Sequence, residues 1–276
     1  MKYGFILPGG DARNAADFAR QVEQAGWDGF FVWEAVWGPD AWISLAAAAM
    51  VTQRIRLGTM LTPISRMRPW KLASETATLD SLSGGRVILS VGLGAIDTGF
   101  KEFGEVTDRK TRAELLDEGL DILTGLWNGQ PFNYNGKHYH IKQVKFPHVP
   151  PPPVQKPRIP IWVVGAWPRP ASMRRVLRYD GLLPAVTGKT GKVEMRTATP
   201  DEIGQMRIWI DQHRTETTPF DCVVEGTTPG DDPAKAAAII GPYADAGTTW
   251  WLEARWDDPD QEHVLARIRQ GPPSLA

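Results

Sequence analysis

The sequence contains a single cysteine, Cys222, among its 276 residues. One cysteine excludes an intramolecular disulfide, and it also excludes a structural zinc site built from several cysteines. His138 and His140 share a face of an expected strand, but no acidic residue is spaced to complete a metal site with them. We therefore expect no bound metal, and we expect Cys222 to pack as a small buried side chain.

The sequence also lacks a long apolar run and an excess of charge of either sign. No segment reaches the roughly 18 apolar residues that a membrane span needs, and the apolar start Met1–Leu7 stops at Pro8-Gly9-Gly10. The net charge is −1 with both signs interspersed, which gives no basic patch for nucleic acid. These absences predict a cytoplasmic protein with a small-molecule substrate and with neither membrane nor nucleic acid as a partner.

What the sequence does have is a regular alternation of β-like and helix-like segments. Short strands separated by helices imply parallel pairing, and eight such units imply closure into a (β/α)8 TIM barrel of the α/β class. An open doubly wound sheet usually has a glycine-rich phosphate turn after its first strand, and Pro8-Gly9-Gly10-Asp11 does not match that pattern. The strands are expected at Lys2–Leu7, Asp28–Trp33, Arg54–Leu61, Arg86–Val91, Ile159–Val164, Gly181–Val186, Phe220–Glu225 and Thr248–Glu253.

The length fits one such barrel, so residues 1–276 are expected to form a single domain. The exception to the alternation is an irregular insertion, residues 129–158, between the fourth helix and the fifth strand. Within it, Phe132–Val144 is predicted as a hairpin that turns at Asn135-Gly136, and the proline-rich Phe146–Pro160 as an extended loop.

Several segments at and around the predicted strand ends carry a resemblance to a known family. In combination they resemble the bacterial luciferase-like monooxygenases over residues 1 to about 190, although any one of them alone would be a weak signal. They are Arg54–Pro63, Arg68–Glu75, Thr78–Arg86 running into Ser90–Gly94, Arg112–Asp121 with Leu126-Trp127, Pro157–Gly165, and Tyr179–Gly181.

The resemblance implies that a flavin lies across the carboxyl-terminal mouth of the barrel, where barrels of this type carry their chemistry. The flavin ring would rest against the ends of the second to fourth strands. In the family a backbone bulge follows the third strand, often with a non-proline cis peptide. The expected ring contacts are Trp33, Glu34, Thr59, Met60, Leu61, Gly92, Leu93 and Gly94, and Thr59, Met60 and Leu61 are the candidates for the bulge.

The phosphate of that cofactor is expected near Gly165, Ala166 and Trp167, at the start of the following helix. Ser172 would add a hydroxyl group. Arg112 occupies the position where luciferase-like proteins place a phosphate-binding arginine, and a guanidinium group suits two phosphate oxygens at once. The ordinary alternative for Arg112 is a surface ion pair with acidic residues of its own helix.

Other candidate site residues also have an ordinary structural explanation. Glu34 is the candidate catalytic residue, or else a solvated carboxylate or half of a salt bridge. Thr187 and Lys189 would bind an anionic group of the substrate or cofactor, or else belong to a polar loop. Trp37 and Trp42 would line an apolar substrate pocket together with Trp33 and Trp167, or else belong to the core.

No hydrolytic triad, glycosidase carboxylate pair or phosphate-loop lysine is found, which is consistent with an enzyme whose cofactor carries the chemistry. The first hypothesis is a monooxygenase that uses reduced FMN and dioxygen on a small apolar organic substrate, with a separate flavin reductase as a partner. The second is hydride transfer by the deazaflavin coenzyme F-420 without oxygen. The third is a barrel that binds flavin without turnover. A homodimer is left open in each case.

Two positions bear on the deazaflavin hypothesis. Family members of that kind often carry an Asp-His pair after the second strand and an acid after the glycines of the fourth, whereas this sequence has Glu34-Ala35 and Ala95. These departures argue against the sugar-phosphate dehydrogenase type but not against deazaflavin binding. The single predicted phosphate site favours FMN. Lys189, Lys192 and Arg169 are the residues available for the longer anionic tail of a deazaflavin.

Overall fold

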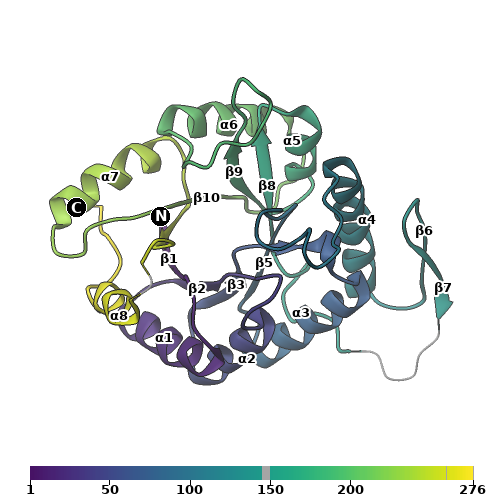
Figure 1. Ribbon diagram of the computed structural model, residues 1–276, viewed down its shortest axis with the longest axis horizontal. Helices are drawn as coiled ribbons and strands as arrows, with labels where there is room; N and C mark the ends of the chain where they lie inside the picture. Colours follow the sequence, from purple (N-terminus) through teal and green to yellow (C-terminus); the bar gives the residue numbers. More distant parts are fainter. Residues whose placement is uncertain (145–149, 259, 276) are drawn as a thin grey trace.

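The computed structural model describes residues 1–144, 150–258 and 260–275. Residues 145–149, which belong to the predicted proline-rich loop, therefore lie outside the described residues. Strands and helices alternate around a central axis, and Figure 1 looks along that axis. The strands are β1 (Lys2–Leu7), β2 (Gly29–Val32), β3 (Arg56–Thr59), β4 (Thr62–Pro63), β5 (Val87–Gly92), β8 (Ile161–Trp167), β9 (Gly181–Val186), β10 (Asp221–Gly226) and β11 (Trp250–Ala254).

The helices form an outer layer around these strands (Figure 1). Most of them begin at an aspartate or threonine whose side chain accepts a hydrogen bond from the first turn, as Asp108 does from the backbone of Thr111. They are α1 (Ala12–Gln24), α2 (Ala41–Val51), α3 (Pro69–Ser83), α4 (Arg109–Trp127), α5 (Pro170–Val176), α6 (Pro200–His213), α7 (Pro233–Asp245) and α8 (Gln261–Arg269).

The sheet closes on itself. Its strand order is β3-β2-β1-β11-β10-β9-β8-β5-β4, and β3 also pairs with β5. All pairings around the ring are parallel, because each strand is followed by a helix that returns the chain to the same end. The predicted (β/α)8 barrel is thereby confirmed.

Two strand boundaries differ from the prediction in ways that matter for the site. The third strand was expected at Arg54–Leu61, with the bulge at Thr59, Met60 or Leu61, whereas β3 ends at Thr59 and β4 begins at Thr62. The Met60–Leu61 peptide bond between them is cis, as the family resemblance predicted. The fifth strand was expected to end at Val164, but β8 continues to Trp167 because it stays paired with β9 that far.

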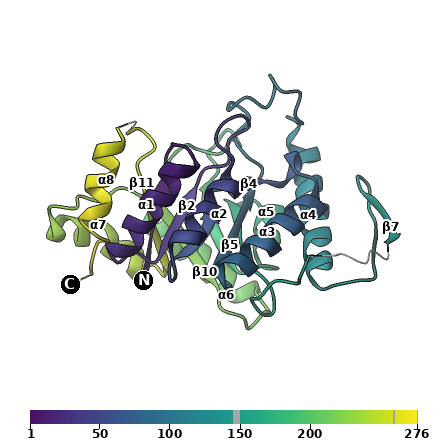
Figure 2. The same cartoon turned by 90° about the horizontal axis from the view of Figure 1, so that it is seen from below.

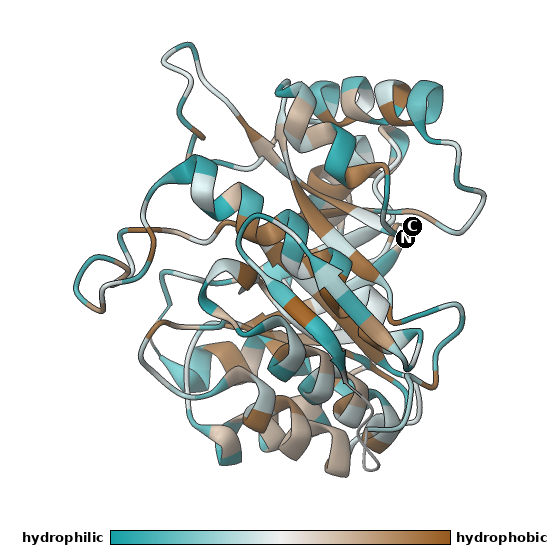
Figure 3. Ribbon diagram, turned by 90° about the vertical axis from the view of Figure 1, so that its right-hand side faces the viewer, coloured by the Kyte–Doolittle hydropathy of each residue, from teal (hydrophilic) through white to brown (hydrophobic). Residues whose placement is uncertain are grey.

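The barrel interior is filled by aromatic rings. Phe31 stacks on Trp162 at 5.4 Å between ring centroids, and Trp162 meets the edge of Trp250 at 5.3 Å. These residues belong to a small inner core, whereas Trp251 and Cys222 face outward into the larger core between barrel and helices. Figure 3 shows the apolar strands within helices of mixed polarity. The inner cluster closes the barrel beneath its mouth.

The predicted hairpin is present as an antiparallel pair, β6 (Phe132–Asn135) and β7 (His140–Val144), standing beside α4 (Figure 1). Its connection is longer than predicted and is held by Glu118 of α4, which accepts backbone N–H groups of Lys137, His138 and Tyr139. His138 is paired with Glu114 at 2.8 Å. Among the described residues, no helix is long and apolar enough to cross a membrane.

Candidate active site

The mouth of the barrel is rimmed by the loops that follow the strands. The loop between β5 and α4 projects furthest at this end (Figure 2). These loops expose large apolar side chains, which favours a binding site at the mouth. The exposed residues are Trp33, Trp37, Ile96, Phe103, Val106, Val193, Met195 and Trp256.

Trp33 lies just inside this rim. It stands two residues after Phe31, which is part of the inner core, so alternation along β2 turns Trp33 toward the barrel axis. The side chain is nevertheless 42% exposed. A cavity of about 40 Å³ also borders Trp33, but it lies on the side of α1 and α2, where Ala15 and Ala41 line it. Trp33 therefore offers an open indole surface at the position where the resemblance places a flavin ring.

Glu34, the next residue, lies on the other side of the same strand end. Its carboxylate accepts a hydrogen bond from the hydroxyl group of Thr62, and the Thr62 hydroxyl lies 2.8 Å from that of Thr59. The two threonines flank the cis peptide bond. Arg66 holds the same segment, because it donates to the carbonyl groups of Glu34 and Ala35 at 3.3 and 3.2 Å. Glu34 thus lies behind the bulge and ties it to β2.

Burial raises the pKa of the Glu34 carboxyl group to about 7, against the opposing effects of the Thr62 hydrogen bond and of Arg66. Only 9% of the side chain is exposed, and Arg66 approaches the carboxylate no closer than 4.0 Å. The hydroxyl groups of Thr62 and Thr59 can hydrogen-bond to Glu34 in either of its protonation states. A carboxylate accepts from Thr62, whereas a protonated Glu34 donates to it while Thr59 turns toward the Ser90 carbonyl group, 3.5 Å away.

Arg112 is buried beneath the loop that follows β5. Its Nη1 donates to the carbonyl groups of Leu93 and Gly94 at 2.7 and 3.0 Å, and its guanidinium group lies over the ring of Phe100. Gly94 has a φ of +74°, and a Cβ there would come within 2.9 Å of Pro63. In this structure Arg112 therefore shapes the loop, and a contact with a cofactor phosphate stays a prediction.

The expected phosphate segment is part of β8 and not of a loop. Its residues consequently alternate between faces, with Ala166 following Val164 on the inner face and Gly165 packed outward against Leu182 and Met173. The N–H group of Ala166 already donates to the Ser172 hydroxyl at 2.9 Å. Helix α5 has only seven residues and begins with a proline, which supplies no donor. A phosphate at this position stays a prediction.

The remaining predicted site residues are divided between core and rim. Trp42 is 7% exposed and lies in the first turn of α2, in the core between barrel and helices. Trp37 is 84% exposed and stacks on Phe103 of the neighbouring loop. Thr187, just after β9, has a buried hydroxyl oxygen without a hydrogen-bond partner in the described part of the chain. Lys189 is exposed on the same loop.

Sequence reasoning passed over one ionisable group of the mouth. The sequence predicts Glu225, near the end of β10, only as the last residue of a strand. The signal was alternation: the outer core contains Cys222 and Val224, and the inner core contains Val223, so Glu225 has the inward register. Trp256, whose indole hydrogen-bonds the Glu225 carboxyl group, was not identified either.

A family model described as luciferase-like monooxygenase matches residues 3–199. The chain therefore belongs to this family. The F-420-dependent glucose-6-phosphate dehydrogenase of Amycolatopsis mediterranei (strain U-32) is 25% identical over 94% of this chain and 92% of its own length. Four further relatives, 28% or 29% identical, carry the same name. Together the family and these relatives identify the protein as an oxidoreductase enzyme.

Solved structures support the fold. The coenzyme F-420 dependent tetrahydromethanopterin reductase from Methanopyrus kandleri superimposes with a TM-score of 0.78 at 17% identity, covering 98% of each chain. The FMN-bound oxygenating constituent of 3,6-diketocamphane monooxygenase from Pseudomonas putida gives 0.67 at 20% identity, covering 97% of this chain and 83% of its own. One barrel architecture therefore serves both deazaflavin and FMN enzymes, and fold alone does not choose between them.

Proposed function

We propose that this protein is a deazaflavin-dependent oxidoreductase that transfers a hydride between coenzyme F-420 and a small, uncharged alcohol or carbonyl compound. The observation that carries the proposal is the set of F-420-dependent relatives, which align over 80–94% of the chain. They favour deazaflavin over the reduced FMN that the sequence alone favoured. Monooxygenation and flavin binding without turnover become outcomes of the test.

The residues of the mouth fit such a cofactor. A flat heterocycle needs an apolar wall with few polar contacts, and Trp33 supplies an exposed indole beside the Met60–Leu61 bulge. The unpartnered hydroxyl group of Thr187 offers one polar contact. Lys189 and Lys192 are exposed on the loop after β9, where they suit an anionic tail that leaves the mouth.

When bound, the deazaflavin supplies a hydride donor or acceptor, and the protein residues orient and shield the reacting atoms. Glu34, Thr62 and Arg66 hold the bulge that would support the ring. The loop from Leu93 onward is fixed by Arg112, and its Phe103 stacks on Trp37. Exclusion of water by these apolar groups favours hydride transfer, because it strengthens the electrostatic interactions at the reacting centre.

An uncharged substrate is favoured by two features of the site. The rim exposes several large apolar side chains, among them Trp37, Phe103 and Trp256. Ala35 and Ala95 stand where sugar-phosphate dehydrogenases of this family often carry a histidine and an acid. The site therefore lacks two polar groups that such a dehydrogenase would use, although the relatives act on glucose 6-phosphate.

The proposal is tested by titrating the purified protein with F-420 and, separately, with FMN while following tryptophan fluorescence. We expect F-420 to bind at least tenfold more tightly, which corresponds to about 1.4 kcal/mol. Tighter binding of FMN would overturn the proposal in favour of a monooxygenase. Binding of neither cofactor would overturn cofactor-dependent chemistry at this mouth.

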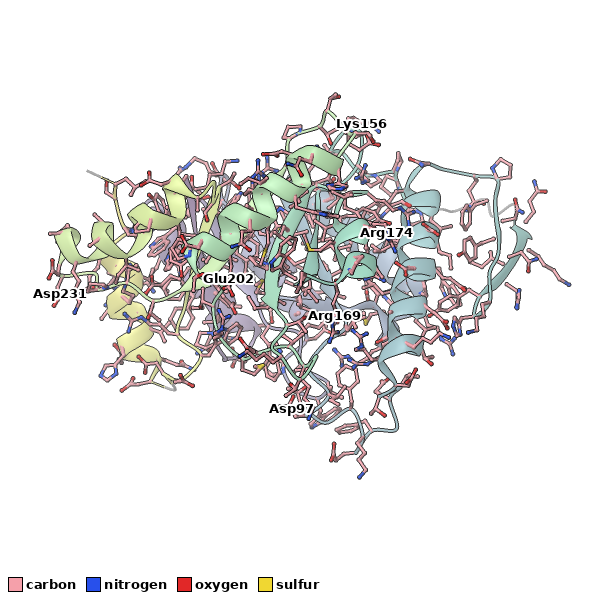
Figure 4. The ribbon with its side chains drawn as sticks, turned by 90° about the horizontal axis from the view of Figure 1, so that it is seen from above. Asp97, Lys156, Arg169, Arg174, Glu202 and Asp231 are labelled. Atoms are coloured by element: carbon pink, nitrogen blue, oxygen red, sulfur yellow. The ribbon has the colours of Figure 1, made fainter. Side chains whose placement is uncertain are left out.

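A double variant and a matched control test where the anionic tail of F-420 binds. We expect the double variant Lys189→Gln with Lys192→Gln to lose several-fold affinity for F-420 at low salt but little affinity for FMN, because only F-420 carries the extended anionic tail. Lys156→Gln is the control. Lys156 is exposed at the opposite end of the barrel from Arg169 and Asp97, as Figure 4 shows. Equal losses in the control and the double variant would place the tail elsewhere.

A further inference from the structure

Glu225 is placed by register on the inner wall of the barrel. In the pairing of β10 with β11, Val223 lies opposite Trp250, and Glu225 lies opposite Leu252. Val223, Trp250 and Leu252 all belong to the inner core. Glu225 therefore stands one inward position above the aromatic floor, on the side of the mouth.

The surroundings leave this carboxyl group facing the mouth. Below it, the contacts among Phe31, Trp162 and Trp250 close the barrel. The indole of Trp256 hydrogen-bonds the carboxyl group from the end of β11, whereas the Thr197 hydroxyl group donates only to the Glu225 main-chain carbonyl, at 3.2 Å. Within the described ranges, none of the ion pairs involves Glu225.

On the adjoining segments two arginines are paired with other carboxylates, and Lys189 and Lys192 are exposed on the loop after β9. Arg255, at the end of β11, lies 3.5 Å from the outward-facing Glu253. On the loop between β9 and α6, Arg196 pairs with Glu194 and Glu202 at 2.7 Å each. Burial raises the pKa of Glu225, and the Trp256 hydrogen bond offsets only part of this.

We propose that Glu225 is the acid–base residue of the mouth, where its carboxyl group exchanges a proton with the oxygen of the substrate. This inference rests on the proposed hydride-transfer function. In the direction of reduction, the carbonyl carbon gains a hydride from the deazaflavin and the C=O π bond breaks. The oxygen then takes the proton of Glu225, so an alcohol forms and a carboxylate remains, which regains its proton from water. Oxidation follows the same steps in reverse.

Glu34 does not have this access. Its carboxylate is directed at Thr62 and Arg66 behind the bulge, so Glu34 is a positioning residue for the cofactor wall. Glu225 is three strands away around the ring, since β1 and β11 lie between β2 and β10. The two carboxyl groups thus flank the mouth from different sides, and only Glu225 faces the space above the aromatic floor.

The first measurement is the melting temperature of Glu225→Gln and wild type between about pH 5 and about pH 8. The folded-state pKa of Glu225 lies above the unfolded value, so wild-type stability falls as pH rises through the folded pKa, and glutamine removes that loss. We expect the two proteins to melt together at the acid end and the variant to melt higher at the alkaline end. Glu216→Gln, on an exposed loop, serves as the control and should melt with wild type at every pH.

The second measurement uses reduced F-420 with cyclohexanone as the probe. We expect Glu225→Gln to bind F-420 within about twofold of wild type while its kcat falls roughly a hundredfold or more, as for loss of a general acid. Glu225→Asp should recover part of the rate, and the wild-type rate should fall at high pH while that of Glu225→Gln stays flat.

Two results overturn the inference: a melting temperature lowered equally at every pH, or wild-type turnover by Glu225→Gln. Failure of wild type to bind F-420 would instead overturn the proposed function. The melting experiment would still report the ionisation of Glu225 in that case, because it needs no cofactor.

Discussion

Strands β10 and β11 carry one glutamate on each face of the same wall, of which Glu253 is fully buried and Glu225 half-buried. Glu253 faces outward, where it accepts hydrogen bonds from the Thr228 backbone and hydroxyl group and lies 3.3 Å from Arg267. Glu225 faces inward and has an indole as its hydrogen-bonding partner. The first carboxylate is surrounded by donors that make it part of the fold, whereas the second is left available, and that availability distinguishes a site residue from a structural one.

The comparison predicts its largest effect at Glu253. Glu253→Gln leaves the Arg267 guanidinium group without a counter-charge inside the protein, and breaking a buried pair in this way lowers the free energy of unfolding by about 3–5 kcal/mol. Urea unfolding at about pH 8 measures it, with Glu225→Gln as the matched glutamate variant. An equal loss of stability in both variants would contradict the distinction between a structural Glu253 and an available Glu225.

Glu34 falls between these two cases, because it has partners but keeps a pKa of about 7. That pKa lies above the ordinary glutamate value, so the stability difference between wild type and Glu34→Gln should shift against wild type as pH rises from about 4 to about 8, by up to about 3 kcal/mol. Unfolding of both proteins at a series of pH values gives the slope. A flat difference would mean that Glu34 is ionised throughout this range.

The assignment of strand residues to the inner or outer face shows most clearly what can be predicted from the sequence. Alternation along the last strand is enough to separate Trp250 from Trp251, and the structure places them in the inner and the outer core. The same rule, applied to β10, would have identified Glu225. It did not single this residue out, because a glutamate at a strand end cannot be told from a solvated one by its sequence alone. The Trp256 hydrogen bond, and the lack of an ion pair with Glu225 among the described residues, appear only in the fold.

The C-terminal end of β8 could not be predicted from the sequence, for a different reason. Gly165, Ala166 and Trp167 read as a loop because a glycine commonly ends a strand, yet pairing with β9 extends the strand through Trp167. Non-local hydrogen bonds decide where such a strand ends. The bonds from Arg112 to the Leu93 and Gly94 carbonyl groups likewise depend on a loop shape that local sequence does not specify.

Arg112 tests whether a residue can serve both the fold and the site. Arg112→Ala removes two charge-assisted hydrogen bonds to the loop, so we expect a loss of about 1.5–3 kcal/mol in stability. If the loop or the guanidinium group supports the cofactor, F-420 affinity should fall ten- to a hundredfold as well. Titration below the melting range separates the two effects, and unchanged affinity would restrict Arg112 to a structural role.

The smallest effect on stability is expected at Trp33, which extends the same comparison to apolar side chains. Trp33→Ala removes an indole that is already 42% exposed, so the loss in unfolding free energy should be only about 1 kcal/mol. Trp42→Ala, in contrast, empties a buried position in the helix–barrel core and should cost about 3–5 kcal/mol. For F-420 the order should reverse: Trp33→Ala loses about tenfold in affinity, while the folded fraction of Trp42→Ala binds normally. Equal binding losses in the two variants would show that Trp33 acts through the fold and that the open indole at the mouth is not a cofactor surface.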